Sequence, residues 1–256
     1  MRIGCCASID DAAIVHEAGY DYIECRLTSL LGEEEDEAVF APVLEQYLAS
    51  PVPASAFNIF MPRAIKVTGT DVNRDKIQRY VQTALPRAKQ VGGEMLVFGS
   101  GGSRNLVDGF PREQAMVQLT TFLQDVADVA EDVGITIAIE PLNLKESNII
   151  NSVSEGVELA ERVDRPKTIR VLADFYHMDE DGEGLSNISK HKDWLAHIHV
   201  ADTGRGSPGT GSYPYDVFKA EVDKAGYTGM ISVECRWQDF AAEAGPSARF
   251  LRSVFG

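Results

Sequence analysis

Residues 135–140 read Ile-Thr-Ile-Ala-Ile-Glu, a run of apolar and β-branched residues that ends in a carboxylate. Such continuous apolar runs are typical of strands that are buried on both faces of a parallel sheet. Similar short runs recur along the whole chain, and stretches with helical spacing separate most of them. The strands predicted in this way cover residues 2–7, 20–25, 52–58, 95–99, 135–140, 168–174, 195–200 and 229–234.

The clearest helical pattern covers residues 111–133, where apolar side chains recur every three or four positions. Pro111 suits the first turn of this helix, because its missing N–H would have no partner there. Further helices are expected at residues 33–49, 71–91, 151–163 and 246–255, and the acidic run at residues 32–37 is interpreted as the solvated start of the first of them.

Eight strands that alternate with helices in about 250 residues form the pattern of a (β/α)8 barrel. A doubly wound sheet is the alternative, but it usually has fewer units and an early glycine-rich phosphate turn. No linker, low-complexity tract or long charged block divides the chain. We therefore expect residues 1–256 to form a single TIM-barrel domain of the α/β class.

The composition excludes several classes of protein. Asp and Glu number 39 against 24 Lys and Arg, a formal net charge of −15, which opposes binding to nucleic acid. No apolar run approaches the ~20 residues that span a bilayer, and the first residues do not resemble a signal peptide. The four cysteines lack Cys-x-x-Cys spacing, so free thiols in a reducing compartment are expected. We expect a cytoplasmic protein with no membrane partner.

Four of the predicted strands end in a side chain that can bind a metal: Glu140, Asp174, His199 and Glu234. Consecutive strands are neighbours in a closed barrel, so these side chains are expected to converge at the carboxyl-terminal mouth, where barrel enzymes place their active sites. Any one of them alone could pair with an arginine or cap the next helix. Together, three carboxylates and one imidazole favour Mn²⁺ or Mg²⁺, with Co²⁺ as a further option, over a thiolate zinc site.

The histidines near these strand ends are expected to differ in role. His197 and His199 lie on the same face of one strand, since side chains alternate along it. His199 is nearer the mouth and is the better ligand, while His197 is expected to pack or hydrogen-bond one layer deeper. His177 follows Asp174 by three positions, on the loop predicted after the sixth strand, and is expected to face the substrate.

The glycine-rich segment at residues 99–104 lacks the Gly-Lys-Ser/Thr ending of a P-loop and is interpreted as a tight active-site loop rather than an anion cradle. Three arginines lie near predicted strand ends. These arginines are Arg104, Arg205 and Arg236. We expect them either to bind a phosphate or carboxylate together at the mouth of the barrel, or each to neutralise a nearby acid.

Several motifs resemble the xylose isomerase-like sugar isomerase/epimerase superfamily. They are Glu140-Pro141-Leu142-Asn143, Asp174-Phe175-Tyr176-His177 and His197-Ile198-His199-Val200-Ala201-Asp202, followed by Arg205 and Pro208-Gly209-Thr210-Gly211. Within that superfamily the chain is most similar to the ketose 3-epimerases related to D-tagatose and D-psicose epimerases. The resemblance covers most of the chain. It implies a divalent-metal-dependent isomerase of carbohydrate metabolism, with Mn²⁺ as the preferred ion and Mg²⁺ or Co²⁺ as alternatives.

The resemblance also implies roles for individual residues. Glu140, Asp174, His199 and Glu234 match the metal ligands of the family, and Glu140 and Glu234 match its two acid/base carboxylates. The residues that match substrate-binding positions are Glu146, His177 and Arg205. The implied partner is a small sugar. A homodimer is also expected, because dimers are the common form among soluble oligomers.

The chemistry agrees with these residue types. Removal of a proton next to a carbonyl leaves an enediolate, whose charge a divalent cation stabilises, and two carboxylates then act as acid and base on opposite faces. The same parts allow hydroxypyruvate isomerisation or an inosose dehydratase-like elimination. An apurinic-site nuclease resembling endonuclease IV needs more histidines than the chain has between His16 and His177. A sugar-binding barrel without activity is disfavoured by the intact set of four ligands.

Overall fold

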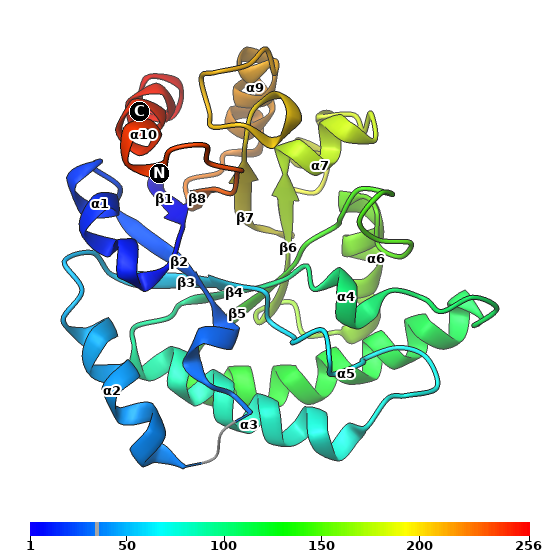
Figure 1. Cartoon of the computed structure of the whole chain (residues 1–256). Helices are drawn as coiled ribbons and strands as arrows, with labels where there is room; N and C mark the ends of the chain where they lie inside the picture. The colour runs from blue at the N-terminus through cyan, green and yellow to red at the C-terminus, as the bar shows by residue number, and fades with distance from the viewer. Residues whose placement is uncertain (34–35) are drawn as a thin grey trace.

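The computed structural model describes residues 1–33 and 36–256. Its eight parallel strands form a closed barrel in chain order, with β8 paired to β1, and the helices surround the strands (Figure 1). The predicted (β/α)8 TIM-barrel fold is confirmed. The strands are β1 (Arg2–Cys6), β2 (Tyr22–Arg26), β3 (Ala54–Asn58), β4 (Met95–Phe98), β5 (Thr136–Ile139), β6 (Ile169–Asp174), β7 (Leu195–Val200) and β8 (Met230–Val233).

The helices connect successive strands on the outside of the barrel. Within the part of the chain that the structure describes, none is both long and apolar enough to cross a bilayer. The helices are α1 (Ala12–Glu17), α2 (Glu37–Leu48), α3 (Arg74–Gln90), α4 (Gly101–Arg104), α5 (Arg112–Val133), α6 (Val153–Val163), α7 (Phe175–Glu180), α8 (Ser186–Lys190), α9 (Tyr215–Ala225) and α10 (Phe240–Phe255), and the 3-10 turns are η1 (Ile9–Asp11), η2 (Leu27–Leu30) and η3 (Thr203–Arg205).

All eight predicted strands are present with ends within two residues of the prediction, but several helix boundaries differ. Helix α10 begins at Phe240 rather than at 246, because the Asp239 side chain accepts a hydrogen bond from the Ala242 N–H and caps the helix there. Helix α2 begins at Glu37 for the same reason, with Asp36 as its cap. Residues 34–35 of the predicted acidic helix start lie outside the described residues.

Five helices are absent from the sequence prediction: α1, α4, α7, α8 and α9. Four of them have six residues or fewer, which is too short for a helical period to show in the sequence. Helix α7 matters for the site, because it stands where the sequence predicts a loop and it carries His177.

The inside of the barrel changes from apolar to polar along the strands. At the amino ends, an apolar cluster that includes Tyr22, Leu172 and Met230 fills the interior. Since side chains alternate along a strand, the next inward positions on β2 and β8 are Glu24 and Ser232, both buried. The barrel interior therefore has an apolar layer at the amino ends of the strands and a polar layer next to it. The candidate site lies beyond the polar layer, at the carboxyl ends of the strands.

Candidate active site

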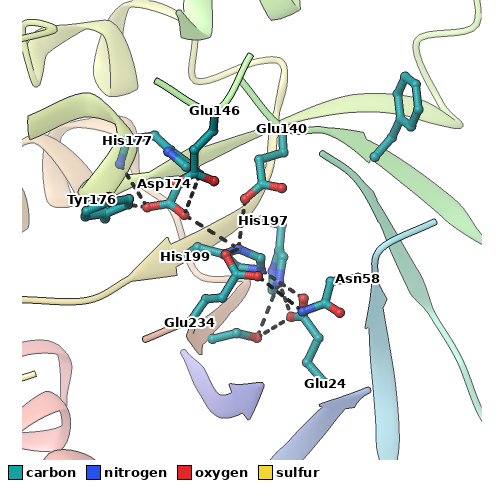
Figure 2. A network of polar contacts seen from close by, with 12 residues as sticks. Glu24, Asn58, Glu140, Glu146, Asp174, Tyr176, His177, His197, His199 and Glu234 are labelled. Carbon is teal, nitrogen blue, oxygen red and sulfur yellow. Dashed lines mark hydrogen bonds and ion pairs between the residues drawn. The ribbon is translucent and has the colours of Figure 1, made fainter. Parts of the chain in front are cut away.

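The four side chains that the sequence predicts as metal ligands converge at the mouth of the barrel (Figure 2). Nδ1 of His199 lies 3.2 Å from Glu140 Oε1, 3.4 Å from Glu234 Oε2 and 3.9 Å from Asp174 Oδ2. Each comes from the end of a different strand, β5 to β8, as expected for neighbours in a closed barrel. Three of the four side chains are almost fully buried, and only Glu234 keeps some exposure, with 21% of its side chain accessible.

The two oxygens of Asp174 differ in their hydrogen bonds within the described part of the chain. Oδ1 accepts hydrogen bonds from the backbone N–H groups of Tyr176 at 2.7 Å and His177 at 3.3 Å, and so caps helix α7. Oδ2 is buried, faces the cluster and accepts no hydrogen bond from the described residues. A buried carboxylate oxygen without a partner is costly, and a bound cation would remove that cost.

His177 points its Nε2 atom toward the same cluster. Its Nδ1 lies 3.2 Å from the backbone N–H of Asn143 and 2.9 Å from the Asn143 side-chain nitrogen, so Nδ1 acts as an acceptor and Nε2 carries the proton. Nε2 lies 3.8 Å from Asp174 Oδ2 and, among the described residues, has no hydrogen-bond partner. The imidazole therefore offers a free N–H donor beside the carboxylates.

Glu24, which the sequence analysis does not single out, holds the histidines from below. Its two oxygens lie 2.9 Å from Nε2 of His199 and 2.9 Å from Nε2 of His197. Oε2 also accepts a hydrogen bond from the Ser232 hydroxyl at 2.6 Å. Because Glu24 holds Nε2 of His199, the other ring nitrogen of His199, Nδ1, faces the carboxylates of Glu140, Asp174 and Glu234. His197 lies one layer deeper, as predicted, with Nδ1 3.1 Å from the Met230 carbonyl.

Arg205 and Asn58 hold the Glu234 carboxylate. Arg205 donates to Glu234 Oε2 at 2.7 Å and to Glu146 Oε1 at 2.9 Å, and its guanidinium lies over the Tyr176 ring at 4.7 Å. Asn58, at the end of β3, donates from Nδ2 to the other Glu234 oxygen at 3.3 Å. All three residues predicted to contact substrate thus surround the cluster: His177 on α7, and the ion pair of Glu146 with Arg205.

The pKa values of Glu140 and Glu234 are shifted in opposite directions. Burial raises the pKa of Glu140, and the negative charge of Glu234 raises it further. Burial also opposes ionisation of Glu234, but the His199 imidazolium and the Arg205 guanidinium outweigh it and lower its pKa to about 2. Burial alone would lower the pKa of His199, yet Glu24 and Glu234 hold it well above its usual range. In the metal-free chain, a proton on Nδ1 therefore balances the surrounding carboxylates.

The glycine-rich segment after β4 packs against Glu140. A Cβ atom at Gly99 would collide with Glu140 Oε2, so a larger residue there would force this carboxylate to move. Arg104 makes no direct ion pair with an acid in the described part of the chain, although the negative charges of Glu140 and Glu155 act on its guanidinium. It is fully buried and donates to three backbone carbonyls, those of Phe98, Glu140 and Ile150, at 2.8, 2.7 and 3.4 Å. Its role is to fix the chain that carries Glu140.

A cavity of about 650 Å³ opens beside the cluster, within the ~300–1,000 Å³ range of small-molecule sites. Glu24, Asn58, Arg205 and Glu234 form its inner wall. From there it reaches Arg26 at the end of β2 and the segments that follow β1, β2 and β8, where its lining includes Ser8, Ser29, Arg236 and Trp237.

The model of the family described as xylose isomerase-like TIM barrel matches residues 12–254. The chain belongs to this family. An L-ribulose 3-epimerase of Methylomonas sp. (strain DH-1) is 30% identical over 222 residues, which are 85% of this chain and 74% of the relative. A putative hydroxypyruvate isomerase of Streptomyces coelicolor is 33% identical over 178 residues, 67% of this chain and 62% of the relative.

Solved structures of family members agree on the fold. The crystal structure of D-allulose 3-epimerase from Methylomonas sp. in complex with D-allulose superposes with a TM-score of 0.85 at 24% identity, covering 100% of this chain and 97% of that one. Relatives of this chain are sugar epimerases and isomerases, and the chain is an enzyme.

Proposed function

We propose that this protein is a divalent-metal-dependent sugar epimerase that abstracts a proton next to a ketose carbonyl, most simply a ketose 3-epimerase. Its relatives among sugar epimerases and isomerases support the general class. The observation that carries the proposal is the placement of Glu140 and Glu234 about His199 Nδ1, with Asp174 completing a cluster of four ligand-type side chains (Figure 2).

The donor set fits a divalent cation. Three carboxylates surround Nδ1 of His199, and the buried Asp174 Oδ2 has no hydrogen-bond partner among the described residues. Glu140, Asp174 and Glu234 also form, with His177, a group whose potential ligand atoms lie within 4.8 Å of one another. Glu140, Asp174, His199 and Glu234 would hold the ion, and oxygen-rich sites of this kind favour Mn²⁺, with Mg²⁺ and Co²⁺ as alternatives. A bound cation supplies the positive charge that stabilises the enediolate.

The two glutamates would move the protons. Glu234, held by Arg205 and Asn58, takes the C3 proton of the ketose as general base. Glu140, from β5, returns a proton to C3 from the other face, so the configuration of that carbon is inverted. Each turnover moves one proton from C3 to Glu234 and one from Glu140 to C3, and the reverse reaction exchanges these roles.

Three further residues would hold the sugar. The free Nε2–H of His177 is placed to donate to a substrate oxygen beside Asp174. Arg205 offers the rest of its guanidinium to the carbonyl or its neighbouring hydroxyl. Glu146, ion-paired to Arg205 and 36% exposed, is placed to accept from hydroxyls near one end of the ketose.

The substrate is a small sugar rather than a nucleic acid, in keeping with the net charge of −15. We infer a cytoplasmic enzyme of carbohydrate metabolism, with one TIM-barrel domain over residues 1–256, that forms a homodimer. Isomerisation of hydroxypyruvate, which moves its carbonyl group to the neighbouring carbon, is the second candidate. It needs the same proton abstraction, and the Streptomyces coelicolor relative favours it.

Proton exchange in D2O tests this function. The Mn²⁺-loaded protein is incubated with a panel of ketoses, aldoses and hydroxypyruvate, and NMR records where deuterium enters. We expect deuterium at C3 of one ketose, with formation of its C3 epimer. Deuterium at C1 or C2 with an aldose product would instead indicate an isomerase. No exchange in any carbonyl compound would contradict proton abstraction.

The contact of Glu24 with His199 gives a separate prediction. In Glu24→Gln the side chain keeps its shape, but its amide has only one oxygen to accept from the two imidazoles. We expect Mn²⁺ affinity to fall about 10–100-fold, as is usual when a group that orients a metal ligand is lost. Titration followed by Mn²⁺ EPR measures this loss.

The matched control for that variant is Ser232→Ala, which removes a hydrogen bond to Glu24 Oε2 but leaves Oε1 on His199. We expect Ser232→Ala to lose less Mn²⁺ affinity than Glu24→Gln. Expressed as the change in log Kd, its loss should be less than one-third of the loss in Glu24→Gln. Equal Mn²⁺ affinity in Glu24→Gln and the unaltered protein would show that Glu24 does not orient His199.

A further inference from the structure

The cavity beside the cluster is longer than the cluster itself. Its inner wall is formed by Glu24, Asn58 and Glu234, and it continues along residues that follow β1, β2 and β8. If the reacting carbons of a sugar lie between Glu140 and Glu234, the other end of that sugar extends into this outer part.

Some of the charged side chains that line the cavity have charged partners, and others have none among the described residues. Glu24 lies between two imidazoles, and Glu234 contacts both His199 and Arg205, so both carboxylates are paired inside the wall. Arg26 and Arg236 are exposed, and neither has an ion-pair or side-chain hydrogen-bond partner within residues 1–33 and 36–256. The outer part of the cavity therefore offers two arginine side chains to an anion, in a chain of net charge −15.

Strand geometry places Arg26 over the inside of the barrel. Arg26 is two positions beyond Glu24 on β2, so it shares the inward face of that strand and stands one layer nearer the mouth. Its partner in the β2–β3 register is Asn58. Asn58 is 6% exposed, and its Oδ1 accepts no hydrogen bond from the described residues.

Trp237 adds an unpartnered donor to the same wall. Its Nε1–H is buried and lacks a hydrogen-bond partner among the described residues. One cavity is thus lined by the Asn58 acceptor, the Trp237 indole donor and two guanidinium groups that have no side-chain partner among the described residues.

We propose that the outer part of this cavity is a subsite for a terminal oxyanion on the sugar, a phosphate or a carboxylate, held by Arg26 and Arg236. The forked guanidinium group suits both anions, since it donates two parallel hydrogen bonds. Asn58 Oδ1 accepts from a hydroxyl between the reacting carbons and the anion. This inference rests on the proposed function, which sets the direction of the sugar in the cavity.

Binding of unreactive sugar alcohols tests the subsite without any turnover. Calorimetry on the Mn²⁺-loaded protein compares a hexitol 6-phosphate with the same hexitol lacking phosphate, and a hexonate tests the carboxylate. We expect at least one of the two anions to bind about 100-fold more tightly than the neutral hexitol, about tenfold from each arginine. In the double variant Arg26→Gln/Arg236→Gln that preference is expected to fall about 100-fold.

The matched control is Arg249→Gln, which removes an exposed arginine on α10 that does not line the cavity. We expect this variant to keep the preference for the anion. Equal binding of hexitol, hexitol phosphate and hexonate by the unaltered protein would overturn the subsite, and so would an anion preference that survives in the double variant. The relative affinities of phosphate and carboxylate identify which oxyanion it takes.

The two proposals can fail separately. If no carbonyl compound exchanges a proton but the hexitol phosphate preference depends on Arg26 and Arg236, the epimerase function is wrong and the subsite stands. If a neutral ketose exchanges its proton and no anion preference is found, the function stands and the subsite is wrong.

Discussion

Replacement of Glu234 by glutamine is expected to lower kcat by about 10²–10⁴-fold, the usual contribution of a general base. The amide keeps the shape of the side chain and can still accept from Arg205, which lies 2.7 Å from Oε2. It cannot take the C3 proton. Bound Mn²⁺ is measured by mass spectrometry in the same preparation, because Glu234 also faces the ion, and kcat is expressed per metal-loaded chain.

The matched control is Glu94→Gln, the same chemical change outside the site. Glu94 precedes β4 and pairs with Arg2 at 2.7 Å, with 49% of its side chain exposed. We expect its kcat to be unchanged and its free energy of unfolding to change by about 1 kcal/mol or less, as is usual for exposed ion pairs. Near-normal turnover of metal-loaded Glu234→Gln would remove Glu234 as the base.

The strands and the fold class follow from the sequence because parallel barrel strands are buried on both faces. The run at residues 135–140 is apolar without alternation, and β5 is indeed covered on both sides, by the barrel interior and by helices. The starts of helices were less predictable. Helix α10 begins at Phe240, directly after its Asp239 cap and six residues before the predicted start at residue 246, and helix α7 is too short to show a period.

The convergence of the site was predictable where a side chain stands at a strand end. Glu140, Asp174, His199 and Glu234 meet because the topology of a closed barrel fixes which strand ends are neighbours. Which atoms face one another is settled by contacts across the barrel. The spacing of residues cannot show that Nε2 of His199 binds Glu24, because these residues are 175 positions apart.

Glu24 nevertheless leaves a signal in the sequence. It is a carboxylate inside the apolar run Tyr22-Ile23-Glu24-Cys25, so the cost of burying it demands a partner, as it does for Glu140. Arg104 leaves no such signal. Its guanidinium is fully buried against backbone carbonyls, and nothing in the local sequence separates this role from anion binding.

Removal of divalent metal with EDTA is expected to abolish turnover, and Mn²⁺ or Co²⁺ is expected to restore it. Without the ion, three carboxylates surround one imidazole, and the proton that His199 holds on Nδ1 takes the place of the cation. Rebinding should also stabilise the fold, by about 2.7 kcal/mol at a metal concentration of 100 times Kd. For a chain of this size that corresponds to a rise in Tm of about 5–10 °C.

Asp174→Asn separates the metal site from the local fold. Asparagine keeps an Oδ1 atom that can accept from the N–H groups of Tyr176 and His177, so the cap of α7 is retained, but an amide nitrogen replaces the unpartnered Oδ2. We therefore expect metal-free Asp174→Asn to unfold within about 1 °C of the metal-free unaltered protein and to gain little Tm from Mn²⁺, since it lacks that ligand. Full turnover in a preparation shown by mass spectrometry to be metal-free would end the metal hypothesis. A full Mn²⁺-induced rise in Tm for Asp174→Asn would instead place the ion away from Oδ2.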